Sequence, residues 1–460
     1  MNNLNNIILK SDSYKTSHAV QYPVGTERVY SYFESRVGAK WDETVFFGLQ
    51  AYIKKFLLGR VIDSAKIRGA KQIIDAHMGP TIFNRAGWEY ILKTYDGKLP
   101  LRIKAVPEGT PVSTSNALMT IENTDPKCFW LTNYIETLLV QTWYPSTVAT
   151  LSREIKKIIK KYLEETGDTI DGLDFKLHDF GYRGVSSDES AGFGDMSHLV
   201  SFKGTDTMIG LVYAQEYYGA EMAGFSIPAS EHSTITSWGQ HHEVDAMRNM
   251  LNQYKDFQLF ACVSDSWDIY NSCSNYWGLE LRQEIINRGG GVVIRPDSGD
   301  PLIVLPKILN ILDERFGSKV NSKGYKVLNY VSLIQGDGIT YETIPLILEK
   351  IKQSGFSTAN IAFGSGGGLL QNVNRDTQRF AFKCSSVVVN GVERDVYKNP
   401  TTDNTKASKK GRLSLVYDGG WNTVNESELG DMDDHLITVF ENGDLITEYT
   451  FDQIRERACI

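Results

Sequence analysis

The pattern of hydrophobic positions changes near residue 170. From there to about residue 368, short apolar runs each end in a polar or glycine-rich turn and are followed by a helical pattern. These runs cover residues 173–177, 199–202, 224–227, 260–263, 291–294, 331–334 and 361–363. Alternating buried strands and helices are typical of an α/β fold with a parallel sheet.

We predict an irregular (β/α) barrel over residues 151–384. In a barrel, the loops that follow the parallel strands converge on one mouth, and here polar side chains follow every apolar run. A doubly wound sheet is the alternative, but it gathers its ligand-binding residues at one switch point. Polar residues after every run therefore favour the barrel.

The two ends of the chain have a different, β-rich pattern. Residues 29–33, 101–122 and 386–392 alternate between apolar and polar side chains, as half-buried strands do. Helical patterns cover much of 45–100 and 129–165. We expect residues 1–150 and 385–460 to join in a second, β-rich α+β domain.

Composition and charge exclude several classes of protein. The 460 residues carry a net charge of −8, which argues against non-specific nucleic-acid binding. The five cysteines form no C-x-x-C pair, so neither a disulfide framework nor a zinc site is indicated. With no signal-like start and no long apolar run, we expect no membrane association and a cytoplasmic location, or the host cytoplasm if the chain is phage-encoded.

Residues 227–238 concentrate reactive side chains in one loop. Glu231 and His232 lie among the hydroxyl groups of Ser230, Ser233 and Thr234. Serine and threonine near a helix start are commonly caps, and a single histidine is commonly structural. His232 becomes a functional candidate because other strand ends carry polar residues of the same kind.

The remaining loops suit a phosphorylated sugar and a flat ring. Glycine-rich residues 364–368, which include Gly366 and Gly367, allow backbone N–H groups to approach an anion, although an ordinary tight turn is the alternative. Cations, carboxylates, small residues and one aromatic ring follow the other runs: Arg295 with Asp297, Gly336 with Asp337, Phe180 with Arg183, and Asp206. Guanidinium groups bind phosphate, and carboxylates bind hydroxyl groups or Mg²⁺.

These segments carry a resemblance to a known family. The segments are DSYK at 12–15, HDFGYRGVSS at 178–187, FKGTDT at 202–207, PASEHSTIT at 228–236, IRPDSG at 294–299, IQGDG at 334–338 and IAFGSGGGLL at 361–370. In this order they resemble the nicotinamide phosphoribosyltransferase family of type II phosphoribosyltransferases, across nearly the whole chain. The resemblance implies that nicotinamide and 5-phosphoribosyl-1-pyrophosphate (PRPP) form nicotinamide mononucleotide and pyrophosphate in NAD salvage.

The resemblance also implies cofactors, partners and residue roles. Mg²⁺ would enter with the substrate pyrophosphate, ATP hydrolysis would be coupled through His232, and the protein would be a homodimer with shared active sites. Catalytic roles fall to His232, Asp297 and Asp265; nicotinamide binding falls to Phe180, Tyr14 of the other subunit, Asp206 and Arg183. Phosphate and ribose binding falls to Arg183, Arg295, Asp297, Gly336, Asp337, Gly366, Gly367, Arg36, Arg375, Lys383, Lys398 and Lys406.

Two other functions remain as alternatives. A nicotinate phosphoribosyltransferase would share the barrel, but Asp206 would then face the carboxylate of its substrate. A catalytically idle nucleotide-binding or signalling protein on the same scaffold would not need His232, Arg295 and Asp297 together.

Overall fold

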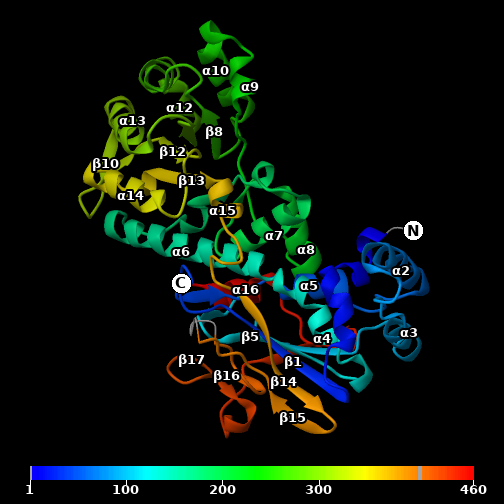
Figure 1. Cartoon of the computed structure of the whole chain (residues 1–460). Coiled ribbons are helices and arrows are strands. Elements are labelled where there is room, and N and C mark those ends of the chain that lie inside the picture. The colour runs from blue at the N-terminus through cyan, green and yellow to red at the C-terminus, as the bar shows by residue number, and fades with distance from the viewer. Residues whose placement is uncertain (1–2, 402–406) are drawn as a thin grey trace. The chain divides into compact units, whose positions relative to one another are not determined.

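The computed structural model describes residues 3–401 and 407–460, which form two compact units. Unit 1 comprises Met1–Thr150, Glu216–Ala220 and Val373–Cys459, and unit 2 comprises Leu151–Gln215, Glu221–Asn372 and Ile460. Each unit has a sheet of its own (Figure 1). Predicted Lys406 lies outside the described residues.

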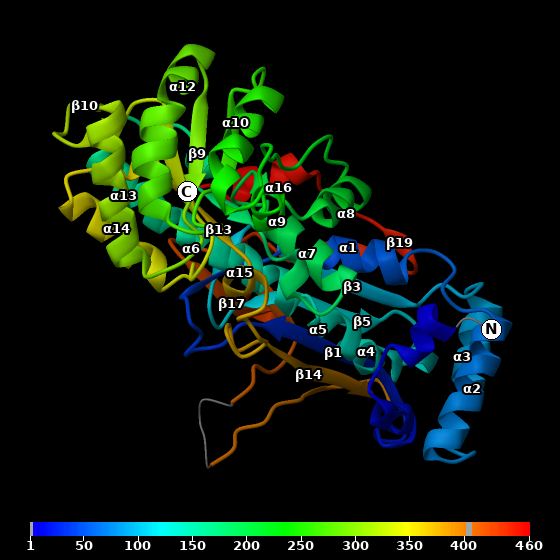
Figure 2. The same ribbon diagram turned by 90° about the horizontal axis from the view of Figure 1, so that it is seen from above.

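Unit 1 is built on a seven-stranded antiparallel sheet in the order β15-β14-β1-β5-β3-β18-β19. Its strands are β1 (Thr26–Glu34), β3 (Leu101–Ala105), β5 (Ala117–Asn123), β14 (Ala381–Val389), β15 (Val392–Asp395), β18 (Ile437–Glu441) and β19 (Asp444–Leu445). Late strand β14 pairs with early strand β1, as Figure 2 also shows, and β18 pairs with β3. Both ends of the chain therefore share one sheet. A domain boundary at residue 384 would fall within β14.

Two short two-stranded sheets and a set of helices complete unit 1. The sheets pair β2 (Glu43–Val45) with β4 (Pro111–Ser113), and β16 (Leu413–Tyr417) with β17 (Trp421–Asn425). The helices are α1 (Leu49–Tyr52), α2 (Ser64–Met78), α3 (Arg85–Thr94), α4 (Leu131–Tyr134), α5 (Glu136–Val140) and α16 (Phe451–Ala458). The chain leaves unit 1 within the long helix α6 (Trp143–Thr166).

Unit 2 contains a six-stranded parallel sheet in the order β7-β6-β13-β12-β9-β8. Its strands are β6 (Leu177–Asp179), β7 (Gly204–Thr205), β8 (Leu259–Val263), β9 (Gly291–Arg295), β12 (Val331–Gln335) and β13 (Ile361–Ser365). Single parallel bridges join Gly204 to Phe225 and Ala229 to Ala261, so residues 225–229 connect the two edge strands. The predicted irregular α/β barrel is confirmed.

Helices follow the barrel strands in the order that the apolar runs predicted. They are α7 (Asp188–His198), α8 (Met208–Tyr218), α9 (His232–Thr236), α10 (Glu243–Gln253), α11 (Ile269–Asn271), α12 (Arg282–Arg288), α13 (Pro301–Phe316), α14 (Thr343–Gln353) and α15 (Gly367–Leu370). Ala261, Val293 and Ile334 pack together inside the barrel. In the part of the chain that the structure describes, no helix combines the length and apolar character needed to cross a bilayer.

Two of the seven predicted strands are wrong. Residues 199–202 form the turn after α7: the N–H of Leu199 donates to the carbonyl of Asp195, and that of Phe202 to the carbonyl of His198. Both apolar side chains are fully buried, and a short buried run has no periodicity that separates a strand from a helix end. Residues 224–227 make only an isolated bridge, and the predicted strand at 173–177 begins as a 3₁₀ turn before β6.

Candidate active site

A cavity of about 560 Å³ lies where the barrel strands end at their carboxyl termini. It is lined by Phe180, Tyr182, Arg183, Asp206, Thr207, Glu231, His232, Ser233, Arg295, Asp297, Gly336 and Asp337. Residues from five separate segments of the chain meet here because parallel strands deliver their following loops to one mouth. Most of the site residues predicted within the barrel are therefore brought together.

The Phe180 ring is held at the end of β6 by close contact with glycine. The N–H of Phe180 donates to the carbonyl of Ser365 at 3.0 Å. A Cβ atom on Gly364 would lie 1.9 Å from the ring carbon Cε2, so only glycine leaves room for the ring. The sequence pattern presented Gly364 as part of a phosphate-binding turn and did not indicate this second role.

Asp206 enters the same cavity from the loop after β7. Its backbone N–H donates to the carbonyl of Asp179 at 3.0 Å, which ties this loop to the end of β6. The hydroxyl of Ser226 donates to Asp206 Oδ1. Ser226 was not predicted; its position directly after the bridged residue Phe225 is the signal that points to it.

His232 is the first residue of α9 and is half exposed, whereas its partner Asp265 is buried. Nε2 of His232 lies 3.0 Å from Oδ1 of Asp265. Because a carboxylate accepts, Nε2 is the nitrogen that donates to Asp265, and in the neutral imidazole this leaves the lone pair on Nδ1. Glu231 instead accepts from the hydroxyl of Ser233, so Asp265 is the carboxylate that orients the imidazole.

One cation and one carboxylate of the cavity lining form a pair. Nη2 of Arg295 donates to Oδ2 of Asp297 at 3.0 Å, and both side chains are largely buried. Asp297 Oδ1 would lie 3.1 Å from a Cβ atom on Gly336, so the small residue lets this carboxylate approach. The arrangement provides a positive charge for phosphate next to an acceptor for hydroxyl groups.

Gly366 and Gly367 lie near the cavity but are not among the residues that line it. Gly366 precedes the short helix α15, and the backbone N of Gly367 is 3.8 Å from the position that a Cβ atom of Gly184 would occupy. The glycine-rich turn thus lies beside the turn that carries Arg183. Its predicted phosphate-binding role stays a prediction.

Unit 1 gathers the predicted basic residues into a cluster of its own. Burial lowers the pKa of Lys383; the charge of Glu136 opposes this, and the positive charges of Lys398, Arg36 and Arg375 lower it further. Three predicted cations therefore act on Lys383, together with one carboxylate, and the net positive charge around Lys383 favours an anion. Tyr14, also in unit 1, is 57% exposed.

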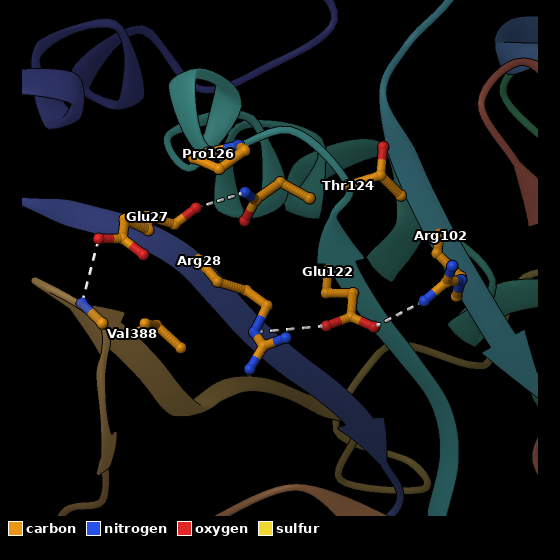
Figure 3. Close-up of a pocket in the computed structure, with 9 residues that line it drawn as sticks. Glu27, Arg28, Arg102, Glu122, Thr124, Pro126 and Val388 are labelled. Carbon is orange, nitrogen blue, oxygen red and sulfur yellow. Dashed lines mark hydrogen bonds and ion pairs between the residues drawn. The ribbon is translucent and has the colours of Figure 1, made fainter.

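A second cavity, of about 370 Å³, lies within unit 1 and is a poorer candidate (Figure 3). Its central carboxylate, Glu122, is flanked by arginines: Arg28 Nε lies 3.7 Å from Oε2 and Arg102 Nη1 lies 3.4 Å from Oε1. Arg412 adds a third contact with Glu122 at 2.8 Å. These charges are already engaged with one another, and none of the predicted site residues lines this cavity.

Residues 175–444, more than half of the chain and nearly the whole barrel, match the model of the Nicotinate phosphoribosyltransferase (NAPRTase) family. The chain belongs to this family. Residues 6–103 also match the model described as Nicotinamide phosphoribosyltransferase, N-terminal domain. The family resemblance inferred from the motifs is confirmed.

Several proteins named nicotinamide phosphoribosyltransferase are similar over the full length. One from Xanthomonas campestris is 52% identical over 467 aligned positions, covering 100% of this chain and 99% of the relative. Another, from Acinetobacter baylyi, is 36% identical and covers 97% of this chain and 95% of the relative. The similarity therefore extends over both units.

Solved structures support the fold of this family member. A nicotinate-nucleotide pyrophosphorylase from Pyrococcus furiosus superposes with a TM-score of 0.64 at 16% identity, covering 100% of this chain and 96% of the other. Human nicotinic acid phosphoribosyltransferase superposes with a TM-score of 0.57 at 15% identity, covering 97% and 92%. At these identities the likeness concerns architecture alone.

Proposed function

We infer that this member of the family is a nicotinamide phosphoribosyltransferase, which forms nicotinamide mononucleotide and pyrophosphate from nicotinamide and PRPP. The names of the relatives that match both units support this activity. The single structural observation that carries the choice of base is Asp206, which lines the same cavity as the Phe180 ring.

The residues suit the chemistry of ribosyl transfer. The pyridine nitrogen of nicotinamide attacks C1 of the ribose, and the bond from C1 to the pyrophosphate oxygen breaks. Positive charge develops on the sugar and negative charge on the leaving group. Carboxylates such as Asp297 near the ribose and cations such as Arg295 near the pyrophosphate therefore stabilise the transition state more than the ground state.

Phe180 and Asp206 would recognise the base. Phe180 stacks on the pyridine ring, and Asp206 accepts a hydrogen bond from the carboxamide NH₂. Nicotinate would place its carboxylate against that of Asp206. Two carboxylates about 4 Å apart repel by roughly 4 kcal/mol at an effective dielectric near 20, enough for about a thousandfold discrimination.

One assay tests this function. Purified protein is incubated with PRPP and Mg²⁺ and either nicotinamide or nicotinate, each with and without ATP, and the mononucleotide is quantified. We expect product from nicotinamide at a kcat/KM about a thousandfold above that for nicotinate. Equal use of the two bases would refute the role of Asp206, and no product from either would refute the activity.

We propose that His232 carries a phosphoryl group between ATP and water. The pyridine nitrogen of nicotinamide has no proton to lose, so the transfer step has no task for a general base. Since Nε2 faces Asp265, Nδ1 is the nitrogen that would attack the γ-phosphorus of ATP, with ADP as the leaving group. Water then takes the phosphoryl group from Nδ1 and releases phosphate.

We also propose that Mg²⁺ enters the site as its complex with PRPP. Asp297 and Asp337 line the cavity and offer the oxygen ligands that Mg²⁺ prefers. The ion would neutralise charge on the pyrophosphate, and the two carboxylates would orient the bound complex.

We further propose a cytoplasmic homodimer in which unit 1 of one subunit completes the site of the other. The support is that Tyr14 and the cation cluster of Arg36, Arg375, Lys383 and Lys398 belong to unit 1, whereas the cavity belongs to unit 2. Tyr14 would then cover the face of the pyridine ring opposite Phe180, and the cations would add to the phosphate site.

A further inference from the structure

Two aspartates are completely buried beside the candidate nicotinamide site. Asp179 ends β6 and Asp195 lies in α7; both are 0% exposed. Neither lines the cavity, but Asp179 directly precedes Phe180, and its carbonyl accepts from the N–H of Asp206. This pair therefore lies behind both of the residues assigned to the base.

Through its Oδ1 atom, each carboxyl group accepts a hydrogen bond that fixes one of the two segments carrying the base-binding residues. Asp179 Oδ1 accepts from the N–H of Gly181 at 2.7 Å, which shapes the turn after Phe180. Asp195 Oδ1 accepts from the hydroxyl of Thr205 at 2.6 Å, and the same hydroxyl oxygen accepts from the N–H of Thr207 at 2.9 Å. That second bond fixes the loop that carries Asp206.

In the described part of the chain, the Oδ2 atoms of the two aspartates are left without a hydrogen bond, and so is the Thr207 hydroxyl, which interacts with Asp179. Among the residues that the structure describes, Asp179 Oδ2 and Asp195 Oδ2 are buried side-chain oxygens without a hydrogen-bond partner. Asp179 pairs with Thr205 across β6 and β7, and the Thr205 hydroxyl donates to Asp195, so both carboxyl groups lie beside Thr205. A proton shared between them would satisfy both Oδ2 atoms. Gly210 leaves room for the Asp195 carboxyl group, since a Cβ atom there would lie 2.0 Å from Asp195 Oδ2.

The surroundings favour a protonated, uncharged carboxyl group on one of these two aspartates. Burial raises the pKa of Asp179 to about 6, and burial together with the charge of Asp179 raises the pKa of Asp195 well above its ordinary value. The charge of Asp206 acts on both in the same direction. Burial lowers the pKa of both nearby imidazoles, His178 and His198, so at neutral pH neither provides a compensating positive charge.

We propose that Asp195 is a positioning residue for the base: it holds a proton that it donates to Asp179, and this bond keeps Phe180 and Asp206 in place. Without that proton, both carboxylates would be buried as anions, and their repulsion would push α7 away from the end of β6 and disturb the Thr205 hydrogen bond that fixes the Asp206 loop. That the base is nicotinamide rests on the proposed function. That the two aspartates share a proton does not depend on that function.

The first test measures the proton directly. Infrared spectra of wild type and Asp195→Asn are compared at pH 7.5, where we expect wild type to show a C=O band of a buried carboxylic acid that the variant lacks. Identical spectra in this region would overturn the proposal, whether or not the protein uses nicotinamide.

The second test follows thermal stability against pH. A group whose pKa is raised by folding stabilises the native state below its ordinary pKa, and this contribution is lost as the pH rises through the raised value. Asparagine keeps a donor for Asp179 and an acceptor for Thr205 but cannot ionise. The Tm of Asp195→Asn relative to wild type should therefore increase from pH 5 to pH 8; a constant difference would contradict the proposal.

Asp313→Asn is the matched control for the stability test. Its hydrogen bond with Lys326 holds the pKa of Asp313 below the ordinary value, so this carboxylate is fully ionised across the same pH range. We expect Asp313→Asn to shift Tm by an amount that is constant between pH 5 and pH 8.

The third test separates positioning from general damage. At pH 7.5, Asp195→Asn should keep the KM for nicotinamide within about twofold, whereas Asp195→Ala should raise it by about tenfold with the KM for PRPP unchanged. Equal KM values for nicotinamide in the two variants would refute the positioning role. Loss of product formation in wild type would refute the proposed function and leave the infrared and Tm results decisive for the proton.

Discussion

Replacing Gly364 with alanine should damage the nicotinamide site by displacing the Phe180 ring. The added Cβ atom would lie 1.9 Å from Cε2, 2.2 Å from Cδ2 and 2.8 Å from Cζ of the ring. Non-bonded carbon atoms prefer separations of about 3.5–4.0 Å, so the ring must move by roughly 1.5 Å. Misplacement of a substrate-positioning group by about 1 Å can cost a hundredfold in rate. We expect kcat/KM for nicotinamide to fall by about that factor.

Steady-state kinetics with nicotinamide and a thermal melt of each variant measure this effect. Gly420→Ala is the control, because its Cβ atom would meet no atom within 4 Å. The overpacking at Gly364 should also cost about 1–3 kcal/mol of stability. In the double variant Gly364→Ala/Phe180→Ala the clash is gone, so Tm should recover while activity stays low.

The double variant also decides whether Gly364→Ala lowers activity by displacing the Phe180 ring. If Gly364→Ala acts by displacing Phe180, the double variant should be no less active than Phe180→Ala alone, because coupled residues are not additive. Two results would refute the reasoning: a kcat/KM for Gly364→Ala within threefold of wild type, or a loss in the double variant equal to the product of the single losses.

Three further predictions concern the proposed roles. Asp206→Asn should remove most of the discrimination against nicotinate; unchanged base preference in competition assays would contradict the charge argument. His232→Ala should abolish ATP hydrolysis and leave slow ATP-independent synthesis, and Asp265→Asn should reduce the ATP-dependent gain; hydrolysis that persists in step with product in His232→Ala would exclude the carrier role. Mixed Tyr14→Ala and Phe180→Ala chains, each strongly impaired alone, should regain activity as heterodimers, whereas no recovery after confirmed subunit exchange would argue against shared sites.

Local sequence patterns determined much of the architecture and the composition of the site. The apolar runs at 260–263, 291–294, 331–334 and 361–363 became β8, β9, β12 and β13 because each is long enough to cross the barrel and ends in a turn that cannot continue a strand. Polar residues directly after such runs had to meet at one mouth, since parallel strands of one barrel end on the same side.

Only the tertiary structure decided what depends on contacts between distant segments. The run at 199–202 is as apolar as a strand, but its backbone hydrogen bonds belong to the end of α7. The nitrogen of His232 that faces Asp265, and the need for glycine beneath the Phe180 ring, follow from side chains more than thirty residues apart in the chain. Asp195 carried no motif signal at all. Its environment is created by burial next to Asp179, and the free energy of a buried charge depends on its neighbours in space, which a local pattern does not contain.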